Sequence, residues 1–213
     1  MKKILLAALT GTLLLGACTN TSSNDEKKEQ SNSNEKNNKK VMYVYNAELR
    51  NYLTMNLATY EKIFNYIDST EDDDNFQEMI PAFRQYSKEL DDNLKYHKKH
   101  TKDLKGKKNE KKINDGFILM SESLSKSLKD KAHEIEKFQS GEITEDELYE
   151  HLIDVQKELE NKKDEFNQIT EDVSDKELKD IIGSVIYKEY KRVMNQFPED
   201  GIVDEEKQLD KKQ

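Results

Sequence analysis

The sequence predicts an all-α protein, an elongated antiparallel up-and-down bundle of four to five helices. Apolar residues recur at intervals of three and four between residues 41 and 197, which is the period of an amphipathic helix. The 213 residues include only 2 Pro and 7 Gly, so the chain is poor in turn-forming residues. Charged residues make up 37% of the chain and hydrophobic ones 34%, a composition that suits slender helices with narrow apolar stripes.

Five apolar stripes give the expected helices in chain order. They cover residues 45–67, 76–104, 113–138, 148–169 and 178–193, and the sequence leaves open whether the last stripe is a separate helix. Short connections between helices make neighbours antiparallel. The spacing therefore predicts that each helix packs beside the one before it.

Helix ends are marked by residues with specific roles. Gly106 is expected to close the second helix, and Gly141 the third. Thr144–Glu147 and Ser174–Glu177 have the spacing of capping boxes, which begin helices. Pro81 lies inside the second stripe, so either that helix begins close to it or the helix is kinked there.

Half of the ten tyrosines fall in the first helix. Helical geometry puts Tyr45, Tyr52 and Tyr60 on the apolar stripe, and Tyr43 and Tyr66 beside it. Tyrosine can bury its ring while its hydroxyl stays in contact with water, so we expect these residues at the edge of the core. Stacking of Tyr43 or Tyr66 on a sugar is the alternative.

The first residues have the layout of an export signal. Two lysines precede an apolar run over residues 4–15, which is too short to span a membrane comfortably. The segment Leu15 to Cys18 resembles a bacterial lipobox, in which the cysteine receives a diacylglyceryl group and becomes the first mature residue. We therefore expect a signal peptide over residues 1–17 and a lipid on Cys18. As the single cysteine, it has no partner for an intrachain disulfide.

The segments that flank the helices lack the means to form a core. Residues 19–40 contain no apolar side chain, so we expect residues 18–40 to be the lipidated cysteine and a disordered tether. Residues 41–197 are expected to form the helical bundle domain. Residues 198–213 begin with Pro198, contain Gly201, and are expected to be a disordered tail.

Positive charge is concentrated between the second and third helices. Removal of residues 1–17 changes the net charge from −9 to −11, yet residues 95–112 have a net charge of +7. A patch of this kind attracts polyanions in a salt-dependent way. The alternative is a solvated turn whose lysines complement the end of a helix. The cluster consists of Lys95, Lys98, Lys99, Lys102, Lys105, Lys107, Lys108, Lys111 and Lys112.

The expected topology gives this cluster a position. In an up-and-down bundle, the turn between the second and third helices lies at the same end as the start of the first. The lysines should therefore lie at the membrane-proximal end. The acidic segment Asp68–Asp74 and the Gly141 turn should lie at the distal end.

Motifs typical of enzymes are missing from the sequence. It has no phosphate-binding glycine loop, no GxSxG and no HExxH. His97 and His100 could share a helix face, but the Glu-x-x-His pairs of a di-iron bundle are absent, so all four histidines are expected at the surface. Asp68–Asp74 lacks the glycine and glutamate of a calcium loop. We expect no enzymatic activity, no metal site and no cofactor.

Part of the third and fourth stripes resembles a known family. The matching segments are Ser121–Leu124, Glu134–Phe138, Gly141–Leu148 and Phe166–Thr170, together with the lipobox at Cys18. They are similar to the YkyA-type cell-wall-binding lipoproteins of Gram-positive bacteria. The resemblance implies a surface lipoprotein with a role at the wall and supplies no catalytic residues.

These expectations combine into one function and one alternative. The chain is expected to be a lipoprotein on the outer face of the cell membrane, anchored through the Cys18 lipid. It would bind teichoic acid, peptidoglycan, anionic lipid headgroups or an envelope protein, and no nucleic acid. The alternative is a lipoprotein that captures a ligand or metal for a transporter or sensor. A third option, an accessory protein or inhibitor of an enzyme, has no sequence feature of its own.

Overall fold

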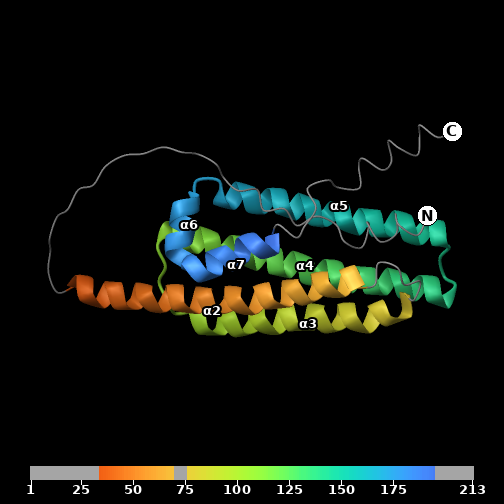
Figure 1. Ribbon diagram of the computed structural model, residues 1–213, viewed down its shortest axis with the longest axis horizontal. Helices are drawn as coiled ribbons and strands as arrows, with labels where there is room; N and C mark the ends of the chain where they lie inside the picture. Colours follow the sequence, from red (N-terminus) through yellow and green to blue (C-terminus); the bar gives the residue numbers. More distant parts are fainter. Residues whose placement is uncertain (1–33, 70–75, 195–213) are drawn as a thin grey trace.

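The fold is all-helical, as the sequence predicts. The computed structural model describes residues 34–69 and 76–194, and within these ranges every regular element is an α-helix. With the labels of Figure 1, the helices are α2 (Asn34–Ser69), α3 (Phe76–Thr101), α4 (Lys108–Ser140), α5 (Glu145–Thr170), α6 (Asp175–Ile182) and α7 (Ser184–Met194). The last stripe is therefore divided into two short helices at Gly183.

The four long helices run up and down along one axis. Helix α3 packs against α2, α4 packs against α3, and α5 packs against α4, so neighbours in sequence are neighbours in space (Figure 1). The shape is elongated, and α5 lies on the side away from α2 and α3. The up-and-down arrangement is thus confirmed for α2 to α5.

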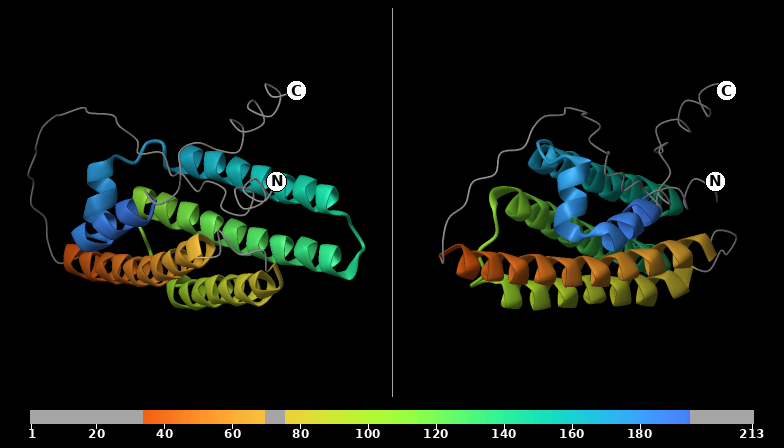
Figure 2. Two further views of the ribbon diagram at one scale, coloured as in Figure 1. Left: turned by 45° about the vertical axis from the view of Figure 1, so that its right-hand side comes forward. Right: turned by 60° about the vertical axis from the view of Figure 1, so that its left-hand side comes forward.

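Helices α6 and α7 are an addition to this frame. Helix α6 turns across the end of the bundle, and α7 folds back against α2 (Figure 2). The ring of Tyr190 in α7 meets the edge of Phe117 in α4, at 5.6 Å between centroids. The short pair therefore contacts both α2 and α4.

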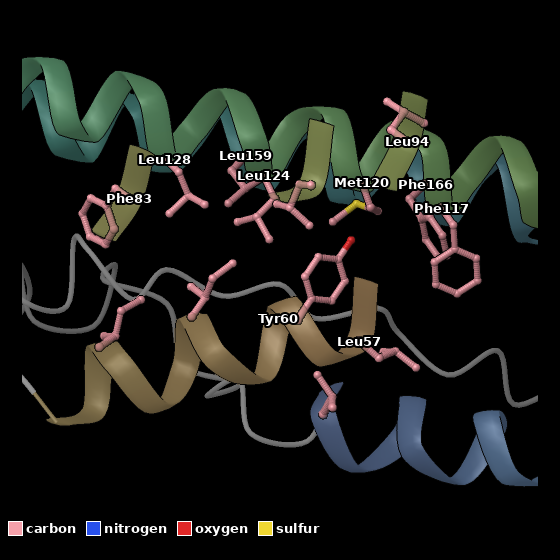
Figure 3. Packing of buried hydrophobic residues seen from close by; sticks show 14 of the residues in the cluster. Leu57, Tyr60, Phe83, Leu94, Phe117, Met120, Leu124, Leu128, Leu159 and Phe166 are labelled. Carbon is pink, nitrogen blue, oxygen red and sulfur yellow. The ribbon is translucent and has the colours of Figure 1, made fainter. Parts of the chain in front are cut away.

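The core follows the apolar stripes. Leu49, Leu90 and Ile135 are completely buried, and Figure 3 shows the leucines and aromatic rings of α2 to α5 interleaved. Tyr45, Tyr52 and Tyr60 lie on the buried side of α2 as their spacing predicts, but they are inside the core and not at its edge, at 5%, 0% and 4% exposure. Tyr66 is half-buried and meets Phe83 edge to face, at 6.4 Å. Tyr43 lies in a part of α2 whose side chains are not described.

Most of the helix ends match their sequence signals. Gly141 ends α4 with a φ of 77°, a left-handed conformation that glycine adopts without strain. The hydroxyls of Thr144 and Ser174 accept from the backbone N–H of Glu147 and Glu177, which confirms both capping boxes. Pro81 lies inside α3, in its second turn and five residues after the helix begins at Phe76, so the one backbone hydrogen bond that its missing N–H would donate is lost there.

Two boundaries differ from the prediction. Helix α2 begins at Asn34, so residues 34–40, which we assigned to the tether, are helical. The first turns of a helix need no apolar stripe, because Lys, Glu and Asn extend an existing helix at small cost. Helix α3 ends at Thr101, which leaves Leu104 in the connection and Gly106 beyond the helix end.

Several predictions concern residues outside the described ranges. These are the signal peptide over residues 1–17, Cys18 with its lipid, residues 19–33 of the tether, residues 70–74 of the acidic segment, and the tail at residues 198–213. Among the helices that are described, none combines the length and the hydropathy needed to cross a membrane.

Candidate functional site

The lysine cluster lies at the end of the bundle where α2 begins. Gly106 rests on the ring of Tyr45, so closely that a Cβ at position 106 would lie 2.7 Å from the ring. Next to it, the Asn46 amide donates to Glu110 Oε1 at 3.1 Å. The Gly141 turn lies at the opposite end (Figure 1). The predicted position of the lysines relative to α2 and the Gly141 turn is therefore confirmed.

A buried carboxylate organises the connection between α3 and α4. Glu110, only 4% exposed, accepts a hydrogen bond from the backbone N–H of Lys107 at 2.6 Å. It also accepts from Asn46, so it holds the start of α4 against α2. On the other side, the N–H of Leu104 donates to the carbonyl of Thr101 at 2.9 Å. The turn is thus a defined structure that presents its lysines from a fixed backbone.

The nine lysines divide into two groups. Lys98 pairs with Glu122 at 2.6 Å, and Lys112 and Lys108 pair with Asp172 at 2.5 and 3.7 Å. Lys102 approaches its neighbour Asp103 at 3.8 Å. The neighbouring ammonium of Lys112 lowers the pKa of Asp172. These four lysines have an acidic partner and contribute less to the field at the surface.

The other five lysines have no acidic partner among the residues that the structure describes. All five are exposed, and they spread over the last turns of α3, the connection and the first turn of α4. Their positive charges therefore face water at one end of the molecule. We call them the free lysines: Lys95, Lys99, Lys105, Lys107 and Lys111.

His97 is not a surface residue, which corrects our expectation. It is 1% exposed, its ring stacks on Tyr52 at 4.2 Å, and its Nε2 lies 2.5 Å from Asn114 Oδ1. Burial lowers the pKa of His97, so the ring is held neutral. The sequence contained the signal, because position 97 follows Leu90 and Leu94 on the stripe at the helical spacing.

The other three histidines lie nearer to the surface. His100 is exposed, stacks on Tyr96 at 3.9 Å, and its Nδ1 donates to the carbonyl of Tyr96. His133 is exposed, and the half-buried His151 has its Nδ1 2.7 Å from Glu134. His97 and His100 therefore do not converge on one site. Within residues 34–69 and 76–194, no three His, Cys, Asp or Glu side chains are grouped as metal ligands.

Sequence reasoning missed a polar layer inside the bundle. The Asn56 amide donates to Ser121 Oγ at 2.7 Å, and the hydroxyl of Tyr60 lies 3.1 Å from the same oxygen. Ser125 donates to Asp91 at 2.6 Å. Serines four residues apart on the apolar stripe of α4 were the available signal. Their hydrogen bonds link α4 to α2 and α3.

A buried lysine lies between α4 and α5. Lys131 is 3% exposed, its Nζ is 3.4 Å from Gln156 Oε1, and burial lowers its pKa to about 8. A lysine is rarely placed in a core from sequence, because its charge is costly to bury. This residue was not among the candidates.

A shallow groove of about 230 Å³ runs along the outer side of α4 and α5. Its apolar lining comes from Leu119, Val155 and Leu159, and Lys126 pairs across it with Glu158 at 2.8 Å. The oxygen of Ser127 is buried and has no hydrogen-bond partner among the described residues. The remaining lining is charged or polar: Glu122, Ser123, Asp130 and Lys162.

Comparison with known proteins yields no relative. No family model, no curated protein and no solved structure matches the chain.

Proposed function

We propose that this chain is a non-enzymatic protein, anchored by a lipid to the outer face of the cell membrane. It binds anionic envelope material through the end of the bundle that carries the lysine cluster. The observation that carries the proposal is the group of five exposed free lysines on one structured turn. Teichoic acid, peptidoglycan-linked polymers and anionic lipid headgroups are all negatively charged ligands of the class that such a patch attracts. The resemblance to YkyA-type wall-binding lipoproteins supports the same proposal.

The pairing pattern separates this proposal from a purely structural role. Lysines in a last helical turn stabilise the helix end, which accounts for residues such as Lys98. The last turn of α3 cannot account for Lys105, Lys107 and Lys111, which lie beyond that helix. Repulsion among like charges makes such a group costly unless an anion is available.

The anchor is the second part of the proposal. The lipobox segment from Leu15 to Cys18 supports a diacylglyceryl group on Cys18. We expect Cys18→Ser to prevent lipidation. The protein should then be found either in the soluble fraction or as an unprocessed precursor in the membrane. Unchanged processing and an unchanged lipid mass would contradict it.

A ligand-capturing lipoprotein is the weaker candidate. The interior is filled by leucine, phenylalanine and tyrosine side chains (Figure 3). The groove on α4 and α5 is crossed by the Lys126–Glu158 ion pair. A capture protein needs a deep pocket with convergent polar groups. The packed interior therefore supports a binding surface over a binding cavity.

The test compares two variants with the same change in charge. In one, the five free lysines are replaced by glutamine. In the control, five exposed lysines from the rest of the bundle are replaced instead: Lys62, Lys88, Lys126, Lys129 and Lys157. Binding of the 19–213 chain to purified teichoic acid and to anionic vesicles is measured at two salt concentrations.

The expected outcome is a difference between the variants. At about 1 kcal/mol for each lysine close to an anionic surface, loss of the five free lysines should weaken binding by roughly three orders of magnitude or more. The control variant should bind much more tightly than the variant without the free lysines. Wild-type binding should fall as the salt concentration rises. Equal loss in both variants would show that only net charge matters and would refute a defined site.

A further inference from the structure

The two ends of the bundle carry opposite charge. At the end opposite to the lysine turn, the connection between α4 and α5 exposes only acidic charge, from Glu142, Glu145, Asp146 and Glu147. Helix α4 joins the two ends and has 33 residues, which corresponds to about 50 Å. The α4–α5 connection is therefore acidic and the lysine turn basic, and exposed Glu171, Glu177 and Asp180 beside the lysine turn reduce the net positive charge of that end.

Exposed apolar side chains gather in the positive half. In the described ranges, the large hydrophobic residues that are exposed are Val44, Tyr96 and Val185, at 38%, 44% and 82%. Val44 precedes Tyr45, whose ring contacts Gly106, and Tyr96 lies beside Lys95. Val185 follows Gly183, which lies against Arg50 of α2. Thus the free lysines and the exposed apolar groups share one end.

The same end is where the described chain continues toward the predicted anchor. Fifteen residues separate Cys18 from Asn34, where α2 begins. The first turns of α2 extend beyond the lysine turn (Figure 1).

We propose that the lysine end docks on the anionic bilayer surface itself, with the Gly141 turn directed away from the membrane. This inference rests on the proposed function and selects the lipid surface over a soluble polymer. A plane of negative charge attracts the lysine turn and repels the acidic α4–α5 connection, so it orients the molecule. Valine and tyrosine side chains beside the lysines suit the bilayer interface, where tyrosine is enriched.

A soluble polyanion requires neither a fixed orientation of the molecule nor apolar groups beside the lysines. It can bind the free lysines from any direction and gains nothing from Val44 or Val185. The acidic α4–α5 connection would not affect its binding, because a flexible polymer does not orient the whole protein. The exposed apolar groups and the opposite charges of the two turns therefore favour a bilayer surface over a soluble polyanion.

The experiment measures which end approaches the bilayer. Residues 19–213 contain every described helix and no cysteine, so single cysteines can be added at Asp103 or Glu142, both exposed. Asp103→Cys and Glu142→Cys remove the same charge from opposite ends. Each is labelled with a fluorophore and mixed with vesicles of phosphatidylcholine containing phosphatidylglycerol and a nitroxide headgroup quencher. Pure phosphatidylcholine vesicles with the quencher are the control.

We expect quenching at position 103 to be at least threefold stronger than at position 142, and only with phosphatidylglycerol present. Substitution of the five free lysines by glutamine should lower vesicle binding by roughly three orders of magnitude or more. Equal quenching at both positions would overturn the orientation. Binding to purified teichoic acid without binding to anionic vesicles would overturn this inference and leave the proposed function standing. Failure to bind either would refute both.

Discussion

The frame of α2 to α5 and the short pair α6–α7 are held in different ways. The frame buries long, continuous stripes, so each helix is stabilised over many turns. Helices of 8 and 11 residues, as in α6 and α7, are too short to be stable alone in water. The pair depends on a few contacts with α2 and α4, whereas the frame distributes its stability over the whole length.

Arginine side chains supply much of the attachment of the pair. Arg50 of α2 donates to the carbonyls of Ile181 and Asp180 at 2.8 and 3.1 Å, which satisfies the end of α6. Arg192 of α7 pairs with Glu61 of α2 at 2.9 Å. Ile182 and Val193 are completely buried beside these contacts. We therefore expect the pair to detach as a unit before the frame unfolds.

The largest expected effect is loss of a core ring in the frame. Phe83 in α3 is 1% exposed, so Phe83→Ala should lower the free energy of unfolding by about 3–5 kcal/mol. Ile182→Ala in the pair should instead raise hydrogen exchange of α6 and α7 with a smaller global loss. Val185→Ala, at an exposed position, is the control. Equal global losses from Phe83→Ala and Ile182→Ala would erase the distinction.

The buried lysine of the frame predicts a pH dependence. The pKa of Lys131 is about 8 in the folded chain and about 10.4 when exposed on unfolding. Between these values the unfolded state binds more protons, so stability should rise with pH, by at most about 1.4 kcal/mol for each pH unit. Urea unfolding of the wild type and of Lys131→Met at pH 7.5 and 9.5 measures the change.

Lys131→Met should abolish this rise. Tyr45 and Tyr52 act in the opposite direction, because burial raises their pKa to about 12 whereas tyrosines of the unfolded chain titrate near 10, so they lower stability as pH approaches 10 and cannot cause a rise. A slope that persists in Lys131→Met would show that another group causes it.

A smaller effect is expected at the junction within the pair. Gly183 has a φ of 88° and a ψ of 150°, a region open essentially to glycine alone. Gly183→Ala should therefore cost about 1–3 kcal/mol of strain, expressed as detachment of α6–α7. Gly141 has a left-handed conformation that other residues adopt with less strain than the one at Gly183. Gly141→Ala should therefore cost less stability than Gly183→Ala. Hydrogen exchange of α7 in both variants gives the comparison.

The smallest effects are expected from the two capping residues. Thr144→Ala at α5 and Ser174→Ala at α6 each remove a hydroxyl that accepts a backbone N–H, at about 1 kcal/mol. In the frame this loss should appear in the global melting temperature. In the pair it should appear mainly as faster exchange in α6. A global loss from Ser174→Ala equal to that from Thr144→Ala would indicate that the pair and the frame unfold together.

Much of the fold was predictable because its signals are local. The stripes, the Gly141 cap and the capping boxes at Thr144 and Ser174 each lie within one or two helical turns. The bundle topology followed from short connections, and with it the end at which the lysines lie. The burial of His97 was readable from its spacing after Leu94, although the surrounding lysines concealed it.

Features that depend on distant residues were not predictable. The division of the lysine cluster needs Glu122 and Asp172, which come from other parts of the bundle. Lys131 was missed because its burial depends on how α5 covers α4. The break at Gly183 is completed by Arg50, which is 131 residues from Ile181 in the sequence.

The sequence by itself determined the helical period, most helix ends, the antiparallel order and the number of lysines in the cluster, because these follow from interactions between near neighbours. The tertiary structure decided which lysines remain free and how α6 and α7 attach to α2. It also decided which polar groups are buried. The physical reason is that charge compensation and burial depend on side chains brought together from distant helices, and only packing sets those distances.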